Sequence, residues 1–228
     1  MKVMKFGGTS VGSPDRMKNV ASLITESGDP TFVVLSAMSG TTNSLIEISN
    51  YLYKKNPDGA NEVINKLEKK YMQHVEELYS TDEYKEKTRE FLREEFKYMR
   101  SFTKDIFTSF EEKSIVAQGE IMSTNMVLNY LQEQGIKATL LSAFDFMRTD
   151  KNAEPDAQYI KEKLTAIMTE NEGYQIYITQ GFICLNAYGE IDNLQRGGSD
   201  FTASLIGVAL GAEEIQIWTD IDGMHNND

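Results

Sequence analysis

The sequence predicts an α/β fold, in which the strands of a parallel sheet alternate with covering helices. Short apolar runs rich in β-branched residues are each followed by a Gly, Ser and Thr loop and then by a helical pattern. Strands are expected at 3–6, 31–35 and 175–179, with a last strand at 215–218. The chain has 228 residues, of which 40% are hydrophobic, so it can bury one large core without disulfides.

The first of these units places a cation beside two residues without side chains. A strand from Val3 to Phe6 leads into Gly7-Gly8, and the next helix is expected to begin at Ser13, with Pro14 in its first turn. Phosphate oxygens can approach the backbone N–H groups of such glycines closely, next to Lys5. The order differs from that of the Walker A motif, in which lysine follows the glycines. Taken alone, a Gly-Gly pair is more often only a tight turn.

The second and third units repeat the strand and polar-loop pattern. Thr31 to Leu35 is followed by the loop 36–43 and by a helix expected from about Ser44. The third unit begins as a strand, Gln175 to Thr179, breaks at Gly181 and continues to Leu185. In an open α/β sheet, ligands bind beyond the carboxyl ends of the strands. The loops are therefore expected to share one ligand site.

A second strand-to-helix junction carries charge. Arg196-Gly197-Gly198-Ser199-Asp200 combines a cation, two glycines, an expected N-cap hydroxyl at Ser199 and a carboxylate. The helix that follows, 201–210, is expected to end at Gly211. The N-terminus of this helix is predicted to bind an anion, although a capped helix beside an exposed arginine remains the simpler interpretation. The last strand leads into Thr219-Asp220 at the same expected edge.

Residues from about 50 to 112 form a predicted helical insertion. Asn61 to Leu78 places apolar residues at helical spacing, and Ser80 with Glu83 predicts a capping box for a second helix. The apolar stripes are expected to pack on the sheet or on each other. A further helix, 114–134, contains Gln118-Gly119-Glu120. Because glycine costs about 1 kcal/mol relative to alanine inside a helix, Gly119 indicates a packing or ligand requirement.

The composition argues against several classes of protein. The formal net charge of −12 disfavours nucleic-acid binding, which depends on Lys and Arg. No signal peptide and no membrane-spanning apolar stretch is visible, so a cytoplasmic location without membrane contact is expected. Cys184 is expected to be a buried small hydrophobe in a reducing compartment. With His74 and His225 far apart, no metal site made of protein side chains is expected.

Seven segments resemble, in order, the motif series of aspartate kinases. They are KFGGTSVG (5–12), VLSAMSGTTN (34–43), QGE (118–120), MRTD with AEPD (147–156), ITQGFI (178–183), RGGSD (196–200) and IWTDIDG (217–223). The resemblance implies a three-layer amino-acid kinase fold, with a mostly parallel central sheet, helices on both faces and a helical insertion. It also implies that residues 1–228 are a catalytic domain truncated near its C-terminal end, without the regulatory ACT domains.

The resemblance implies an enzyme that transfers the γ-phosphoryl group of ATP to the β-carboxylate of L-aspartate. The product would be 4-phospho-L-aspartate, in the first step of lysine, threonine and methionine biosynthesis. By the resemblance, Lys5 and Asp200 are catalytic, and Mg²⁺ is held mainly through the nucleotide phosphates. The full-length protein is expected to form a homo-oligomer.

Further site residues are implied in the same way. Those expected to bind the amino acid are Ser36, Thr42, Glu120, Phe182 and Arg196. Those expected to bind ATP, besides Lys5, are Gly7, Gly8, Gly198, Ser199, Thr219, Asp220 and His225. His225 stands where many relatives carry tyrosine, so the base or ribose contact is expected to differ.

Two other functions are compatible with parts of this pattern. One is a related amino-acid kinase acting on glutamate or a similar small acid, which the KFGGTS and RGGSD segments disfavour. The other is a ligand-sensing module without catalysis. The presence of Lys5, Glu120, Arg196 and Asp200 argues against such a module.

Overall fold

The computed structural model describes residues 1–104, 106–194 and 197–219. Five parallel strands form the central sheet in the order β3-β4-β2-β1-β7. Their bounds are β1 (Lys2–Phe6), β2 (Thr31–Leu35), β3 (Ala138–Leu140), β4 (Ile176–Gln180) and β7 (Glu214–Trp218). The predicted α/β class and parallel sheet are confirmed.

The N-terminal strand β1 lies inside the sheet. It pairs with β2 on one side, where Lys2 faces Thr31, and with β7 on the other, where Lys2 faces Glu214. Alternate residues of β1 enter two different cores, Met4 on one face of the sheet and Val3 on the other. This alternation follows from the period of two of an extended strand.

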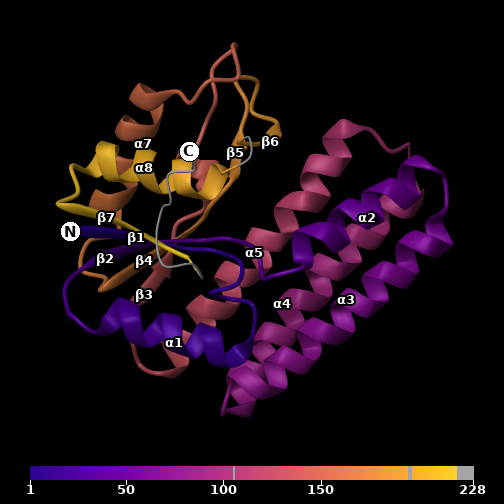
Figure 1. Cartoon of the computed structure of the whole chain (residues 1–228), viewed down its shortest axis with the longest axis horizontal. Helices are drawn as coiled ribbons and strands as arrows, with labels where there is room; N and C mark the ends of the chain where they lie inside the picture. The colour runs from indigo at the N-terminus through magenta and orange to yellow at the C-terminus, as the bar shows by residue number, and fades with distance from the viewer. Residues whose placement is uncertain (105, 195–196, 220–228) are drawn as a thin grey trace, which may run out of the picture.

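Helices cover both faces of the sheet (Figure 1). On one face lie α1 (Pro14–Thr25) and α5 (Ser109–Glu133), whose buried side chains pack with Met4. On the other face lie α6 (Ala143–Phe146), α7 (Ala157–Glu170) and α8 (Gly198–Leu210). The three-layer arrangement expected for the chain is therefore present.

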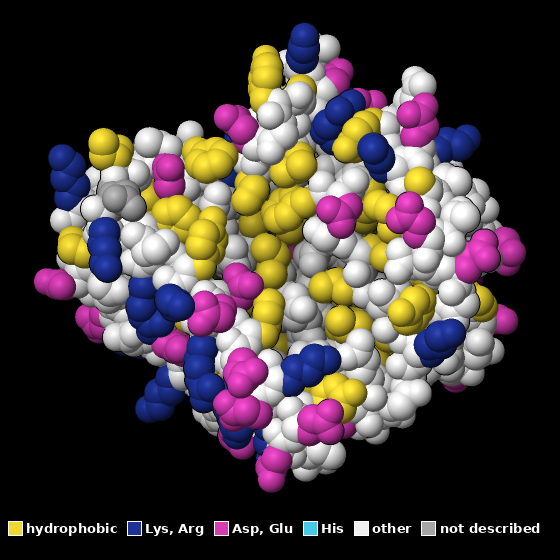
Figure 2. All heavy atoms as spheres, turned by 180° about the vertical axis from the view of Figure 1, so that it is seen from behind, with side chains coloured by type: hydrophobic (Ala, Val, Ile, Leu, Met, Phe, Trp, Pro, Cys, Tyr) yellow, Lys and Arg dark blue, Asp and Glu magenta, His cyan; other side chains and the backbone are white. Residues whose placement is uncertain are grey.

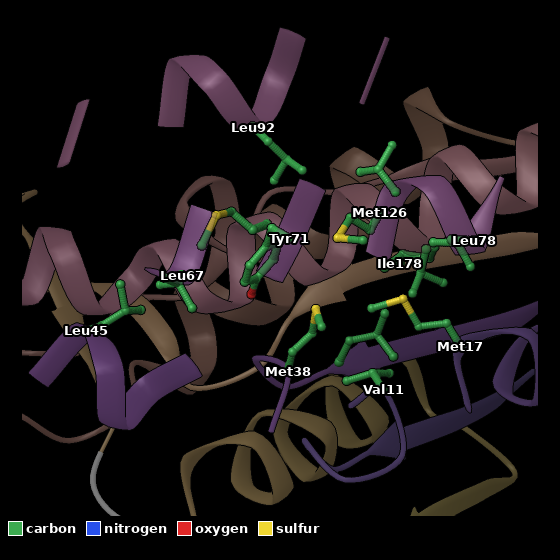
Figure 3. Packing of buried hydrophobic residues seen from close by; sticks show 14 of the residues in the cluster. Val11, Met17, Met38, Leu45, Leu67, Tyr71, Leu78, Leu92, Met126 and Ile178 are labelled. Atoms are coloured by element: carbon green, nitrogen blue, oxygen red, sulfur yellow. The ribbon is translucent and has the colours of Figure 1, made fainter. Parts of the chain in front are cut away.

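The helical insertion stands beside the sheet. It contains α3 (Pro57–Leu78), α4 (Asp82–Ser101) and the short 3₁₀ helix η1 (Phe102–Lys104), and these pack with α2 (Thr41–Tyr53) and α5 (Figure 1). Figure 3 shows one continuous apolar core that runs from Leu92 and Tyr71 in this bundle to Met17 and Ile178 at the sheet. The apolar stripes of α3 and α4 pack on each other and on α5, which also contacts the sheet, so their expected packing is confirmed.

Several predicted helix starts are wrong. Helix α2 begins at Thr41 instead of Ser44, and α8 begins at Gly198, so Ser199 lies inside the helix and is not its N-cap. The Ser80–Glu83 capping box does not form. Instead, Glu133 Oε1 accepts hydrogen bonds from the backbone N–H groups of Ser80 at 2.9 Å and Thr81 at 2.7 Å.

The start of α5 also differs from the expected Ser114. This helix begins at Ser109, where the side chains of Thr108 and Glu111 form a capping box. Helix α7, the edge strand β3 and the strand β6 (Ile191–Asn193) were not predicted. The predicted continuation of the third strand to Leu185 is present as β5 (Ile183–Leu185), which leaves the main sheet and pairs with β6 in an antiparallel hairpin.

The surface of the described residues carries both signs of charge. On the face seen in Figure 2, Lys and Arg side chains are interspersed with Asp and Glu, and apolar side chains gather in the hollowed middle. Among the described residues, no helix is long and apolar enough to cross a membrane.

Candidate functional site

A pocket of about 420 Å³ lies where β1, β2 and β4 end. Because the strands are parallel, their carboxyl ends meet at one edge, and the loops that follow them line the pocket together with α5 and α8. The pocket brings together most of the predicted site residues, namely Lys5, Gly8, Ser36, Thr42, Glu120, Phe182, Gly198, Ser199 and Asp200.

Lys5 is the only cation among the described residues that line the pocket. Its Nζ lies 2.7 Å from Asp200 Oδ1, and the Lys5 side chain is 12% exposed against 53% for Asp200. The ion pair joins the end of β1 to the first turn of α8. It fixes the ammonium group of Lys5 at the pocket while one side of the carboxylate remains in contact with solvent.

Two helices point their N-termini at the pocket. Helix α2 follows Gly40 (φ 81°) and α8 follows Gly197 (φ 85°), and neither N-cap residue supplies a side-chain hydrogen bond. Glycine adopts these left-handed conformations without steric cost. The first N–H groups of both helices therefore lack a side-chain cap and, with the helix dipoles, favour a bound anion.

Glu120 is a buried carboxyl group of α5 at the bottom of the pocket. Its Oε1 accepts a hydrogen bond of 3.2 Å from the backbone N–H of Ala37, while its Oε2 is buried without a hydrogen-bond partner among the described residues. Burial raises the pKa of Glu120 to about 8, and the Ala37 hydrogen bond offsets only part of this shift. The buried carboxyl group is therefore suited to bind a positively charged group of a ligand.

Ser36 connects the loop after β2 to two neighbouring helices. Its hydroxyl donates a 3.0 Å hydrogen bond to Ser199 Oγ in α8, and its carbonyl oxygen accepts a 2.8 Å bond from Ser123 Oγ in α5. The loop is therefore held from both sides of the pocket.

Phe182 has a backbone conformation that is unusual for a residue with a side chain. Its φ is 70°, and its N–H donates a 3.1 Å hydrogen bond to Thr202 Oγ1 in α8. Thr202 in turn donates to the carbonyl oxygen of Gly198 at 2.7 Å. Strained conformations of this kind cluster at ligand sites, and here the conformation places the ring in the pocket wall.

Gly8 and Gly119 allow close packing around Ala37. A Cβ atom on Gly8 would lie 2.7 Å from the Ala37 carbonyl oxygen, and one on Gly119 would lie 2.7 Å from Ala37 Cβ. The packing requirement expected for Gly119 is confirmed. Gly7 differs, because a Cβ there would meet its nearest neighbour, Lys5 Nζ, at 3.5 Å.

Some predicted residues lie elsewhere. Gly7 does not line the pocket, and Thr219 lines a second cavity of about 250 Å³ together with Phe6, Arg16 and Trp218. The predicted residues Arg196, Asp220 and His225 lie outside the described part of the chain.

The sequence interpretation assigned no role to several lining residues. Ala37, Met38 and Ser39 line the pocket from the loop after β2, and Asn43 lines it from the first turn of α2. All four belong to the VLSAMSGTTN segment. The segment follows a buried strand, and this position could have predicted that these residues line the ligand site.

Comparisons with known proteins agree with this geometry. The sequence model of the amino acid kinase family matches residues 1–228. The chain belongs to the amino acid kinase family. Among curated relatives, lysine-sensitive aspartokinase 3 of Escherichia coli is 32% identical over 99% of this chain and 50% of its own length. The chloroplastic aspartokinase 2 of Arabidopsis thaliana is 34% identical over 97% of this chain and 42% of its own length.

A solved structure of this kinase family shows the same fold. E. coli aspartokinase III in complex with aspartate and ADP has a TM-score of 0.84 and 32% identity, over 98% of this chain and 50% of that one. The chain spans about half the length of the relatives it matches. The predicted membership of the amino-acid kinase family and its fold are thereby confirmed.

Proposed function

We propose that the chain is the catalytic part of an aspartate kinase, which transfers the γ-phosphoryl group of ATP to the β-carboxylate of L-aspartate. One arrangement carries the proposal: the buried Glu120, with its unpartnered oxygen, shares a pocket with the Lys5–Asp200 pair and two helix N-termini without side-chain caps. An amino acid requires an anion for its ammonium group, and phosphate requires cations and N–H donors. The aspartate and ADP in the E. coli relative are consistent with this division.

The proposed substrate contacts follow from the charges. Glu120 Oε2 receives the ammonium group of aspartate, and Arg196 is proposed to receive the α-carboxylate through a bidentate contact. Ser36, Thr42 and Phe182 complete the amino-acid side of the pocket. The β-carboxylate is then free to face the phosphoryl group.

The protein contributes mainly position and charge to this reaction. An oxygen of the β-carboxylate forms a bond to Pγ while the bond from Pγ to the bridging oxygen of ADP breaks. No general base is required, because a free aspartate carboxyl group has a pKa of about 3.9 and is ionised at neutral pH. Lys5 stabilises the negative charge on the transferred group, and Asp200 holds Lys5 in place.

A metal ion is proposed to bind together with the nucleotide, through the phosphates and with Asp200 nearby. No group of three or more His, Cys, Asp or Glu side chains among the described residues could hold a metal ion by itself. Asp200, half exposed beside Lys5, is available to bind a water molecule of such an ion. When bound, Mg²⁺ would neutralise charge on the phosphates.

ATP consumption by the full-length protein tests the proposal. We expect ADP formation only when L-aspartate and Mg²⁺ are both present, and hydroxylamine should trap the acyl phosphate. Equal or faster turnover with L-glutamate would favour the related kinase instead. Binding of aspartate without any ATP turnover would indicate a sensing module.

The remaining expectations are part of the same proposal. Gly7, Gly8, Gly198, Ser199, Thr219, Asp220 and His225 are proposed to contact ATP. The cytoplasmic location, the homo-oligomeric state, the biosynthetic pathway and the division of the full-length protein into catalytic and ACT domains stay predictions.

A further inference from the structure

Helix α3 of the insertion contacts the substrate loop through two consecutive residues. The substrate loop is defined here as residues 36–43, which comprise the loop after β2 and the first turn of α2. Lys70 Nζ donates a 3.1 Å hydrogen bond to the carbonyl oxygen of Ser39. The Tyr71 hydroxyl lies 3.0 Å from Thr41 Oγ1, and the two groups share a hydrogen bond. The substrate loop is therefore fixed from a helix in which the sequence shows no functional motif.

The contact between Tyr71 and Thr41 is shielded from water. Both side chains are 0% exposed, and the Tyr71 ring packs edge-on against Phe96 of α4 at 5.9 Å between ring centroids. Figure 3 shows Tyr71 extending from α3 toward the layer that contains Met38 and Leu45. Removing one hydroxyl would leave the other buried without this partner, which costs more than losing an exposed hydrogen bond.

Thr41 transmits this contact to the pocket. A Cβ on Gly119 would lie 3.6 Å from Thr41 Cγ2, so Thr41 packs against the backbone of the residue directly before Glu120. Thr42, which follows Thr41, lines the pocket. Gly40, which precedes Thr41, is the left-handed N-cap of α2. A shift of Thr41 would therefore displace the N-terminus of α2 and the wall of the pocket together.

We propose that Tyr71 and Lys70 are positioning residues for the amino-acid substrate, so that the helical insertion supports the substrate site through the substrate loop. The identity of that substrate rests on the proposed function. Neither residue lines the pocket. Both act through the backbone and hydroxyl groups of the substrate loop.

Steady-state kinetics of two variants and two matched controls test the proposal in the full-length protein. Tyr71→Phe should raise the KM for L-aspartate about fivefold to tenfold, the factor that corresponds to one net hydrogen bond, and leave the KM for ATP unchanged. Lys70→Met should act in the same direction with a smaller factor, because the Lys70 hydrogen bond is exposed to solvent.

The controls remove the same groups at places that do not touch the substrate loop. The buried Tyr79 hydroxyl donates a 2.7 Å hydrogen bond to the carbonyl oxygen of Met126, so Tyr79→Phe should lower stability without changing the KM for aspartate. Lys66 lies one turn before Lys70 and pairs with Glu62, so Lys66→Met should change neither constant. Equal KM values in Tyr71→Phe and wild type, or equal increases in Tyr71→Phe and Tyr79→Phe, would overturn the proposal.

Hydrogen exchange tests the same link without turnover. The N–H of Ser39 donates to Gly8 and that of Thr41 to Met38, and both amides should exchange faster in Tyr71→Phe than in Tyr79→Phe. Unchanged exchange in Tyr71→Phe would contradict the positioning role. Absence of aspartate-dependent turnover in the wild type would instead contradict the proposed function alone, and the exchange experiment would still decide this inference.

Discussion

Lys5 and Asp200 lie in sequence near opposite ends of the described chain, and yet Lys5 Nζ approaches Asp200 Oδ1 to 2.7 Å. The contact crosses from the end of β1 to the first turn of α8, and both ends of it line the pocket. A cation held in this way needs little rearrangement when a phosphoryl group approaches, which is the condition for strong electrostatic stabilisation.

Replacement of Lys5 by alanine should lower kcat by about 10²-fold or more, the scale for loss of one preorganised charge in the transition state. Lys2→Ala is the matched control, because Lys2 is at the opposite end of the same strand and lines a different cavity. It should keep wild-type kcat. Wild-type kcat in a folded Lys5→Ala protein would remove Lys5 from the mechanism.

Glu120→Gln separates binding from chemistry. The variant keeps the size of the side chain and the acceptor for the Ala37 N–H but loses a charge-assisted hydrogen bond, worth about 1.5–3 kcal/mol. The KM for aspartate should then rise about 10-fold to 100-fold, with little change in the KM for ATP. If the KM for ATP changes instead, Glu120 belongs to the nucleotide or metal site.

The stability of the ligand-free protein should depend on the ionisation of Glu120. Its pKa rises from an ordinary 4.5 to about 8, chiefly because the group is buried. Between these values the folded state keeps a proton that the unfolded state has released, so the contribution of Glu120 to the unfolding free energy decreases as pH rises from 4.5 to 8. Urea denaturation at several pH values should show a smaller decrease in Glu120→Gln. Parallel pH profiles for both proteins would contradict the raised pKa.

Aspartate binding should release a proton near pH 7. The protonated Glu120 must ionise to pair with the ammonium group of the substrate, because the bound cation lowers its pKa. Calorimetry in buffers with different ionisation enthalpies measures this release directly. Glu120→Gln should bind aspartate more weakly and release no such proton.

The two adjacent glycines after β1 should respond differently to alanine. Gly8→Ala places a Cβ at 2.7 Å from the Ala37 carbonyl oxygen, and such overpacking typically destabilises a protein by about 1–3 kcal/mol. Gly7→Ala meets its nearest atom at 3.5 Å and should leave Tm nearly unchanged. Thermal unfolding of both variants measures the difference. If Gly7→Ala lowered Tm more than Gly8→Ala, the close contact between Gly8 and the Ala37 carbonyl oxygen would not explain the loss of stability.

The edge of the sheet that carries the site could be predicted from the sequence. Lys5, Ser36 and Phe182 each follow or end a strand with a clear apolar pattern, and parallel strands bring such positions together. Gly119 also gave a local signal, because glycine is costly within a helix.

Other features have no local signal. The residues directly before α4 are held by Glu133, which is distant in the sequence, so the nearby Ser80 and Glu83 gave a wrong prediction. The contact between Tyr71 and Thr41 also joins separate helices, and a tyrosine in an apolar stripe does not reveal where its hydroxyl points. The strand β3 has only three residues, too few to establish an alternating pattern.

The position of β1 between β2 and β7 has a consequence for synthesis on the ribosome. Residues 2–6 leave the ribosome before both of their partners, and the second partner, residues 214–218, follows nearly the whole described chain later. Sheets with such distant pairings form slowly, and an unpaired strand edge is a template for other chains. A nascent chain that stalls before β7 would therefore expose the unpaired backbone edge of β1, the strand that carries Lys5.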